Sequence, residues 1–184
     1  MIAYVRIPKT ASCTVLDAIK SSGVESVDHE PIGFYPEAEA TFTFVRNPWE
    51  RMFSWYRHSK FYFHRSFREY ILGPDGDPLN PVGPTQVYRH GTKTQTDLLI
   101  ADQAEWWRDR RPTYIGKFEN LGRDLHCIGS LLDFQVDPVQ HLNRSESALE
   151  HPYCPSIWDE EMIARMAPIF DPFAAEFAYE VWPC

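Results

Sequence analysis

An α/β fold in one domain, residues 1–184, is the architecture that the sequence predicts, and three observations support it. A length of 184 residues suits one compact core, which would bury roughly 70% of the surface of the unfolded chain. Hydrophobic residues make up 43% of the chain, with 12 Phe, 6 Trp and 9 Tyr among the aromatics, as in a globular protein. β-prone and helix-periodic segments alternate along the chain, which is typical of α/β folds.

The chain begins with a predicted strand, loop and helix. Residues Ile2–Ile7 are β-prone, and Pro8 ends this strand because proline cannot donate to a ladder. A helix is expected between Ser12 and Gly23, where apolar residues recur at helical spacing and the glycine can end it. A weaker strand is expected at Val24–Val27.

A second strand and helix follow at once. Thr41–Arg46 is the strongest strand candidate in the chain, since it is rich in β-branched and aromatic residues. Asn47 is a suitable N-cap, Pro48 takes the first helical position, and Glu50 follows the cap by three residues as in a capping box. The apolar stripe of this helix consists of Trp49, Met52, Phe53 and Tyr56.

The rest of the chain is less regular at first. Gly73–Gly91 holds four Pro and four Gly, which predicts a long irregular connection near a binding cleft. The later elements expected are a helix over Thr96–Trp106, a strand over Thr113–Phe118, a helix over Asn120–Leu132 with Asn120 as its cap, and a helix over Asp159–Ala167.

Charge and composition exclude several classes of protein. A net charge of −8 argues against a nucleic-acid binder, and no apolar run approaches the ~20 residues of a membrane span. The N-terminus does not resemble a secretory leader, so a cytoplasmic protein is expected. The four scattered cysteines are interpreted as thiols, and no metal site is expected from His151 and Cys154 alone. The oligomeric state is not predicted.

Two loops carry the chemistry, because each joins the end of a strand to the start of a helix, where anions bind. The first loop, Pro8–Thr14, combines one lysine with three hydroxyl residues and two small ones. It is not a Walker A loop, since G-x-x-x-x-G-K-[ST] is absent. A kinase is therefore a less favoured function for this chain. In the second unit Arg46 ends the strand, and Ser54 follows two helical turns later.

These two loops together resemble those of sulfotransferases that use 3′-phosphoadenosine 5′-phosphosulfate (PAPS), in particular the carbohydrate branch of that family. The matching stretches are Ile7-Pro8-Lys9-Thr10-Ala11-Ser12, Phe44-Val45-Arg46-Asn47-Pro48-Trp49-Glu50-Arg51 with Ser54-Trp55-Tyr56, Ile115-Gly116-Lys117-Phe118-Glu119-Asn120-Leu121 and His141-Leu142-Asn143-Arg144-Ser145. Gly-Gly is frequent in the family at Ala11-Ser12, and arginine is usual at Lys117. A Thr-Ala-Ser turn occurs in members that sulfate glycosaminoglycans.

The resemblance implies a P-loop-like central parallel sheet flanked by helices. It also implies PAPS as the donor, adenosine 3′,5′-bisphosphate (PAP) as the product, and no required metal. Lys9 would contact the 5′-phosphate and the bridging oxygen, and Arg46 and Ser54 would bind the 3′-phosphate. Further nucleotide contacts would come from Thr10, Ala11, Ser12, Cys13 and Thr14 in the first loop, and from Asn143, Arg144 and Ser145 in a late loop that closes over the nucleotide.

The acceptor and the catalytic base are less defined. His29 is the favoured base, because a neutral imidazole accepts a proton at physiological pH; Glu30 is the alternative, and Asp28 is a distant third. The acceptor would be a carbohydrate or a small molecule with a hydroxyl group. Residues 46–68 hold six Lys or Arg and one acid, so this segment either attracts an anionic acceptor or forms a solvated helix face. A nucleotide-binding module without catalysis and a small-molecule kinase are the alternative functions.

Overall fold

The computed structural model describes residues 1–26, 32–63, 66–72, 89–90, 93–94, 103–107, 110–139 and 157–179. The chain divides into two compact units. The first unit consists of Met1–Arg46 and Gln103–Glu146, and the second of Asn47–Asp102 and Ser147–Cys184. One domain over residues 1–184 stays a prediction.

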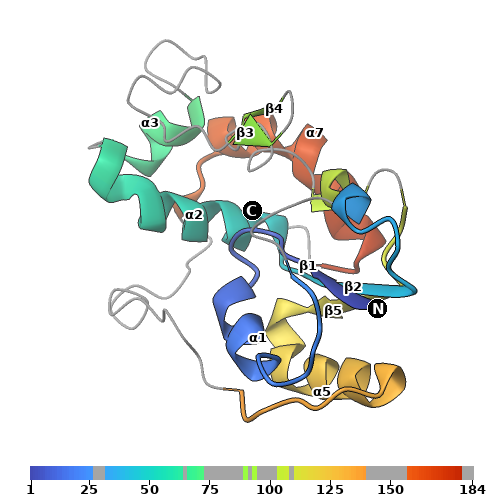
Figure 1. Ribbon diagram of the computed structural model, residues 1–184. Coiled ribbons are helices and arrows are strands. Elements are labelled where there is room, and N and C mark those ends of the chain that lie inside the picture. The colour runs from blue at the N-terminus through green and yellow to red at the C-terminus, as the bar shows by residue number, and fades with distance from the viewer. Residues whose placement is uncertain are drawn as a thin grey trace. The chain divides into compact units, whose positions relative to one another are not determined.

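A three-stranded parallel sheet forms the centre of the first unit (Figure 1). Its strands are β1 (Ile2–Val5), β2 (Ala40–Val45) and β5 (Tyr114–Lys117), and β2 lies between the other two. The register pairs Phe42 of β2 with Tyr4 on one side and with Tyr114 on the other. Strands β1 and β2 are buried on both faces, as parallel strands usually are. The predicted α/β class is confirmed.

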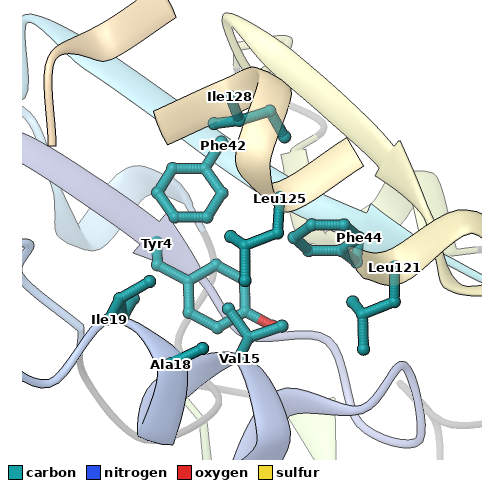
Figure 2. Close-up of a cluster of buried hydrophobic side chains, with 9 residues drawn as sticks. All are labelled: Tyr4, Val15, Ala18, Ile19, Phe42, Phe44, Leu121, Leu125 and Ile128. Carbon is teal, nitrogen blue, oxygen red and sulfur yellow. The ribbon is translucent and has the colours of Figure 1, made fainter. Parts of the chain in front are cut away.

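Two helices cover one face of this sheet, namely α1 (Ser12–Ala18) and α5 (Leu121–Leu132). Tyr4, Phe42 and Phe44 point toward these helices because side chains alternate between the two faces of a strand. The Tyr4 and Phe42 rings stack with centroids 5.0 Å apart. Figure 2 shows the resulting cluster, which consists of Tyr4, Val15, Ala18, Ile19, Phe42, Phe44, Leu121, Leu125 and Ile128.

Most predicted elements of the first unit are present, with shifted ends. In the described part of the weaker strand, residues 24–26, there is one bridge, in which Glu25 N donates to Ile2 O at 3.0 Å and Tyr4 N donates to Glu25 O at 2.8 Å. Asn120 takes the N-cap position of α5, as predicted, but its side chain makes no capping hydrogen bond. It is also the last residue of the 3-10 turn η3 (Phe118–Asn120), and its ψ of 24° departs from the extended backbone that a capping side chain needs. Of the expected helix over Thr96–Trp106, the described part is the 3-10 helix η2 (Gln103–Trp107). A further 3-10 turn, η1, spans Ile32–Phe34.

The second unit contains α2 (Pro48–Phe63), α3 (Phe67–Leu72) and α7 (Glu160–Glu176). The predicted cap of α2 is confirmed, since Asn47 Oδ1 accepts a hydrogen bond from Trp49 N at 3.0 Å. Asp159 caps α7 by accepting from Met162 N at 2.9 Å. Two short antiparallel strands, β3 (Arg89–His90) and β4 (Lys93–Thr94), also belong here. The remainder of the predicted irregular connection lies outside the described residues.

Helix α7 is longer than predicted, because it continues through two prolines. It runs past the expected end at Ala167 and includes Pro168 and Pro172, both of which are exposed. Each proline removes one helical hydrogen bond, but burial of the opposite helix face offsets this loss. The buried residues of that face are Met162, Met166, Phe170, Phe173 and Ala174. Among the described helices, none is long and apolar enough to cross a bilayer.

Candidate functional site

Two predicted site residues, Lys9 and Arg46, come together where β1 and β2 end. Because β1 and β2 are adjacent and parallel, their carboxyl ends lie at the same edge of the sheet, and the segment after each strand starts from that edge. Arg46 Nη1 donates to the Lys9 carbonyl oxygen at 3.5 Å, which joins the two segments. The sequence thus predicted a pair of cations that the fold brings into contact.

The loop after β1 has an unusual backbone. Lys9 has a φ of 68° and Ala11 a φ of 66°, the left-handed region that costs a residue with a Cβ atom about 1–2 kcal/mol. Between them, Thr10 is fully buried and its Oγ1 donates to Ile7 O at 2.9 Å. The C-terminal end of β1 is tied to β2 as well, since Thr43 Oγ1 donates to Val5 O at 2.7 Å. Strained backbone of this kind persists where surrounding contacts hold it.

The ammonium of Lys9 is partly buried beside another cation. No hydrogen bond or ion pair joins its side chain to any residue within the described ranges. Burial lowers the pKa of Lys9 to about 8, and the nearby positive charge of Arg46 contributes to this shift. Cys13 acts in the opposite direction but does not cancel it. A partly buried cation that lies beside another cation is a suitable partner for an anion.

Several contacts hold Arg46 in place. Its guanidinium carbon lies 4.2 Å from the centroid of the Phe118 ring, within the range of a cation–π interaction. Its backbone N–H donates to Gln103 Oε1 at 3.0 Å, and its carbonyl oxygen accepts from Gln103 Nε2 at 2.7 Å. The third contact is the hydrogen bond to Lys9 described above. Arg46 is therefore a fixed cation and not a mobile surface side chain.

The remaining residues of the first loop lie next to this pair. Ser12, Cys13 and Thr14 form the first turn of α1, with Ser12 and Thr14 buried and Cys13 exposed. Cys13 and Cys127 are free thiols, as predicted. Helix α1 has seven residues, so its dipole adds little to the charges of Lys9 and Arg46.

The other predicted site residues belong to the second unit or fall outside the described residues. Ser54 lies on α2, in the second unit, and its contribution stays a prediction. His29, Glu30, Asn143, Arg144 and Ser145 fall outside the described residues. Within the described ranges, no three His, Cys, Asp or Glu side chains gather as metal ligands would.

Sequence reasoning missed Gln103, which lies in a segment predicted as an ordinary helix. Its contact with Arg46 spans 57 residues of chain, and no local pattern signals such a pairing. Phe118 lies in the stretch Ile115–Leu121 that matches the family, but the sequence did not predict its contact with Arg46. Neither a family model, nor a curated protein, nor a solved structure matches the chain.

Proposed function

We propose that the chain is a sulfotransferase, which moves the sulfuryl group of PAPS to a hydroxyl group of a carbohydrate acceptor. The observation that carries the proposal is the joined pair Lys9 and Arg46, two cations at the ends of neighbouring parallel strands. In the PAPS family, residues at these two positions bind the 5′-phosphate and the 3′-phosphate of one nucleotide. PAPS, when bound, supplies a sulfur atom attached to a good leaving group, adenosine 3′,5′-bisphosphate.

Lys9 has the properties that the reaction needs at the leaving phosphate. As the acceptor oxygen bonds to sulfur and the bond from sulfur to the bridging oxygen breaks, negative charge develops on that bridging oxygen. A preorganised ammonium stabilises such charge better than water does, because it needs no reorganisation. Within the described residues the Lys9 ammonium has no protein partner to compete for it, and its pKa of about 8 keeps most of it protonated at pH 7.

Arg46 suits the 3′-phosphate. A planar guanidinium binds phosphate through two parallel hydrogen bonds and stays charged at any physiological pH. Contacts with Phe118 and with the Lys9 carbonyl hold it before any ligand binds. Ser54 would add a hydroxyl contact to the same phosphate.

The left-handed backbone at Ala11 also supports the resemblance. The family often has glycine at this position, and glycine is the residue that adopts a positive φ without strain. Ala11 keeps this conformation at a φ of 66°, so the loop has the backbone geometry that a glycine would give it. The difference in sequence therefore does not imply a different loop.

The catalytic base completes the proposal. The acceptor hydroxyl loses its proton as its oxygen bonds to sulfur, and a neutral His29 or an ionised Glu30 would take that proton. A P-loop-like fold, a cytoplasmic location and independence of metal remain part of the same proposal. Positioning and electrostatics would supply most of the rate enhancement, as in phosphoryl transfer.

Isothermal titration calorimetry with adenosine 3′,5′-bisphosphate tests the nucleotide site. The wild type should bind, and Arg46→Ala should bind at least tenfold more weakly. Arg123→Ala is a matched control, because Arg123 is an exposed arginine of α5 that pairs only with Asp124 among the described residues. A wild type that does not bind, or an Arg46→Ala variant that binds as well as the wild type, contradicts the proposal.

Transfer of radiolabelled sulfate from PAPS to a panel of glycans and small alcohols tests the reaction itself. Lys9→Ala should abolish transfer, and His29→Ala and Glu30→Gln should identify the base. Tight binding without transfer to any acceptor would favour the alternative, a nucleotide-binding module without catalysis.

A further inference from the structure

We propose that Gln103 is a positioning residue whose side-chain amide holds Arg46 in place to distinguish a nucleotide with a second phosphate from one without. This inference rests on the proposed function. It adds a residue that belongs to neither of the two loops.

The side chain of Gln103 binds both polar groups of one backbone residue. Its Oε1 accepts from Arg46 N at 3.0 Å, and its Nε2 donates to Arg46 O at 2.7 Å. Two such bonds to one residue are what a neighbouring strand provides in a sheet. Arg46 is the first residue after β2, whose last pair with β5 is Val45 with Lys117. The amide of Gln103 therefore extends the order of the sheet by one residue, to the residue that carries the charge.

Burial makes this arrangement specific. Gln103 is 1% exposed, so water does not compete for its amide. A buried amide without partners is costly, and the Arg46 backbone satisfies one donor and one acceptor of Gln103. Any movement of Arg46 from this place would leave both groups unpaired. The backbone of Arg46 is thus fixed before a ligand arrives.

The side chain of Arg46 is supported independently of its backbone. Phe118 lies against the guanidinium at 4.2 Å, and the Lys9 carbonyl accepts from Nη1 at 3.5 Å. These contacts can hold the guanidinium only if the Arg46 backbone stays at a fixed distance from Phe118 and Lys9. Gln103 supplies that condition. Preorganisation of this kind increases affinity by lowering the ordering cost of binding.

The chemistry also requires a neutral amide at position 103. A glutamate there has the same size and can still accept from Arg46 N, but it loses the donor to Arg46 O. It would also place a negative charge beside the Arg46 carbonyl oxygen. Gln103→Glu therefore tests the donor with little change of volume, and Gln103→Ala removes both hydrogen bonds.

The experiment compares two nucleotides on the full chain by calorimetry, adenosine 3′,5′-bisphosphate and adenosine 5′-monophosphate. The dissociation constant for the monophosphate divided by that for the bisphosphate measures how much the 3′-phosphate contributes to binding. We expect Gln103→Ala and Gln103→Glu to reduce this ratio about tenfold, with the affinity for the monophosphate changed less than twofold. In the double variant Arg46→Ala with Gln103→Ala, the ratio should equal that of Arg46→Ala alone, because the two residues act through one contact.

Other results of this experiment would overturn the inference. If Gln103→Ala and Gln103→Glu keep the wild-type ratio, or lose both nucleotides equally, Gln103 has no positioning role and the inference is overturned, while the proposed function stands. Thermal unfolding of each variant identifies a general loss of folded protein. If the wild type binds neither nucleotide, or binds the two equally, the proposed reading of the 3′-phosphate fails and this inference fails with it.

Discussion

Arg46 donates a hydrogen bond from its guanidinium to the carbonyl oxygen of Lys9, 37 residues earlier in the chain, at 3.5 Å. Lys9 accepts it from a left-handed backbone conformation, next to an Ala11 of similar φ. This contact links the segments after two neighbouring strands into one cationic edge.

The ring of Phe118 should contribute to nucleotide binding through Arg46. Phe118→Leu removes the aromatic face under the guanidinium but keeps an apolar side chain there. Such an interaction contributes about 0.5–2 kcal/mol, so the dissociation constant for adenosine 3′,5′-bisphosphate should rise several-fold. Phe118→Tyr keeps the ring and should bind as the wild type does. Equal affinity of the Leu and Tyr variants in calorimetry would exclude a role for the ring.

Nucleotide affinity should fall as the pH rises above 8. The pKa of Lys9 is lowered to about 8 in the free protein, so the charged fraction falls about tenfold between pH 7 and pH 9. The dissociation constant for adenosine 3′,5′-bisphosphate should rise by a similar factor over this range. Lys9→Arg keeps its charge and should show a flat profile. A steep profile in Lys9→Arg would assign the pH dependence to another group.

The charge on Lys9 should lower the stability of the unliganded protein. Its folded pKa lies below the value of 10.5 in the unfolded chain, so below about pH 8 the folded state carries a charge that burial and Arg46 disfavour. As the pH rises from 8 toward 10.5, this destabilisation disappears. At pH 7, Lys9→Met should therefore have a free energy of unfolding about 1–2 kcal/mol higher than that of the wild type, allowing for solvent screening. Chemical denaturation at pH 7 and pH 10 checks that the difference shrinks.

Glycine should stabilise the loop at position 11. Ala11 has a φ of 66°, which glycine adopts without the clash of a Cβ atom. Ala11→Gly should raise the free energy of unfolding by up to about 1 kcal/mol. The control is Ala164→Gly on an exposed position of α7, where glycine should lower stability by about 1 kcal/mol. A loss of stability in both variants would contradict the left-handed loop.

Asp159 should stabilise α7 mainly as its cap. Its carboxylate accepts from Met162 N at 2.9 Å and pairs with Arg68 Nε at 2.8 Å, and the hydrogen bond to Met162 N contributes most to lowering its pKa. Asp159→Ala should cost about 1 kcal/mol, and Asp159→Asn should cost less because asparagine also caps. Since the folded pKa is lowered, this stabilisation is present above pH 4 and is lost in more acidic solution. Urea denaturation at pH 7 and pH 3 measures both effects.

Local patterns predicted the framework of the fold and the two cations. The strands that end near Lys9 and Arg46 are short runs of β-branched and aromatic residues, and the two residues Asn47 and Pro48 mark the start of the next helix. These signals depend on residues that are close together in the chain, so they can be recognised from the sequence alone. The end of α7 was misplaced for the opposite reason, because the packing of Phe170 and Phe173 keeps the helix intact beyond Pro168.

The parts of the site that sequence did not predict depend on contacts between distant residues. Gln103 binds the backbone of a residue 57 positions away, and a polar residue in a helical pattern gives no sign of such a partner. The left-handed conformation of Lys9 and Ala11 is equally hidden, because the residues that usually signal it are glycine and asparagine. Geometry alone revealed both.

A crystal structure of the chain with adenosine 3′,5′-bisphosphate tests the central claim most directly. The account predicts one nucleotide whose 5′-phosphate lies within hydrogen-bonding distance of Lys9 Nζ and whose 3′-phosphate lies within hydrogen-bonding distance of the Arg46 guanidinium. A nucleotide that contacts neither residue, or that places both phosphates away from the ends of β1 and β2, would contradict it.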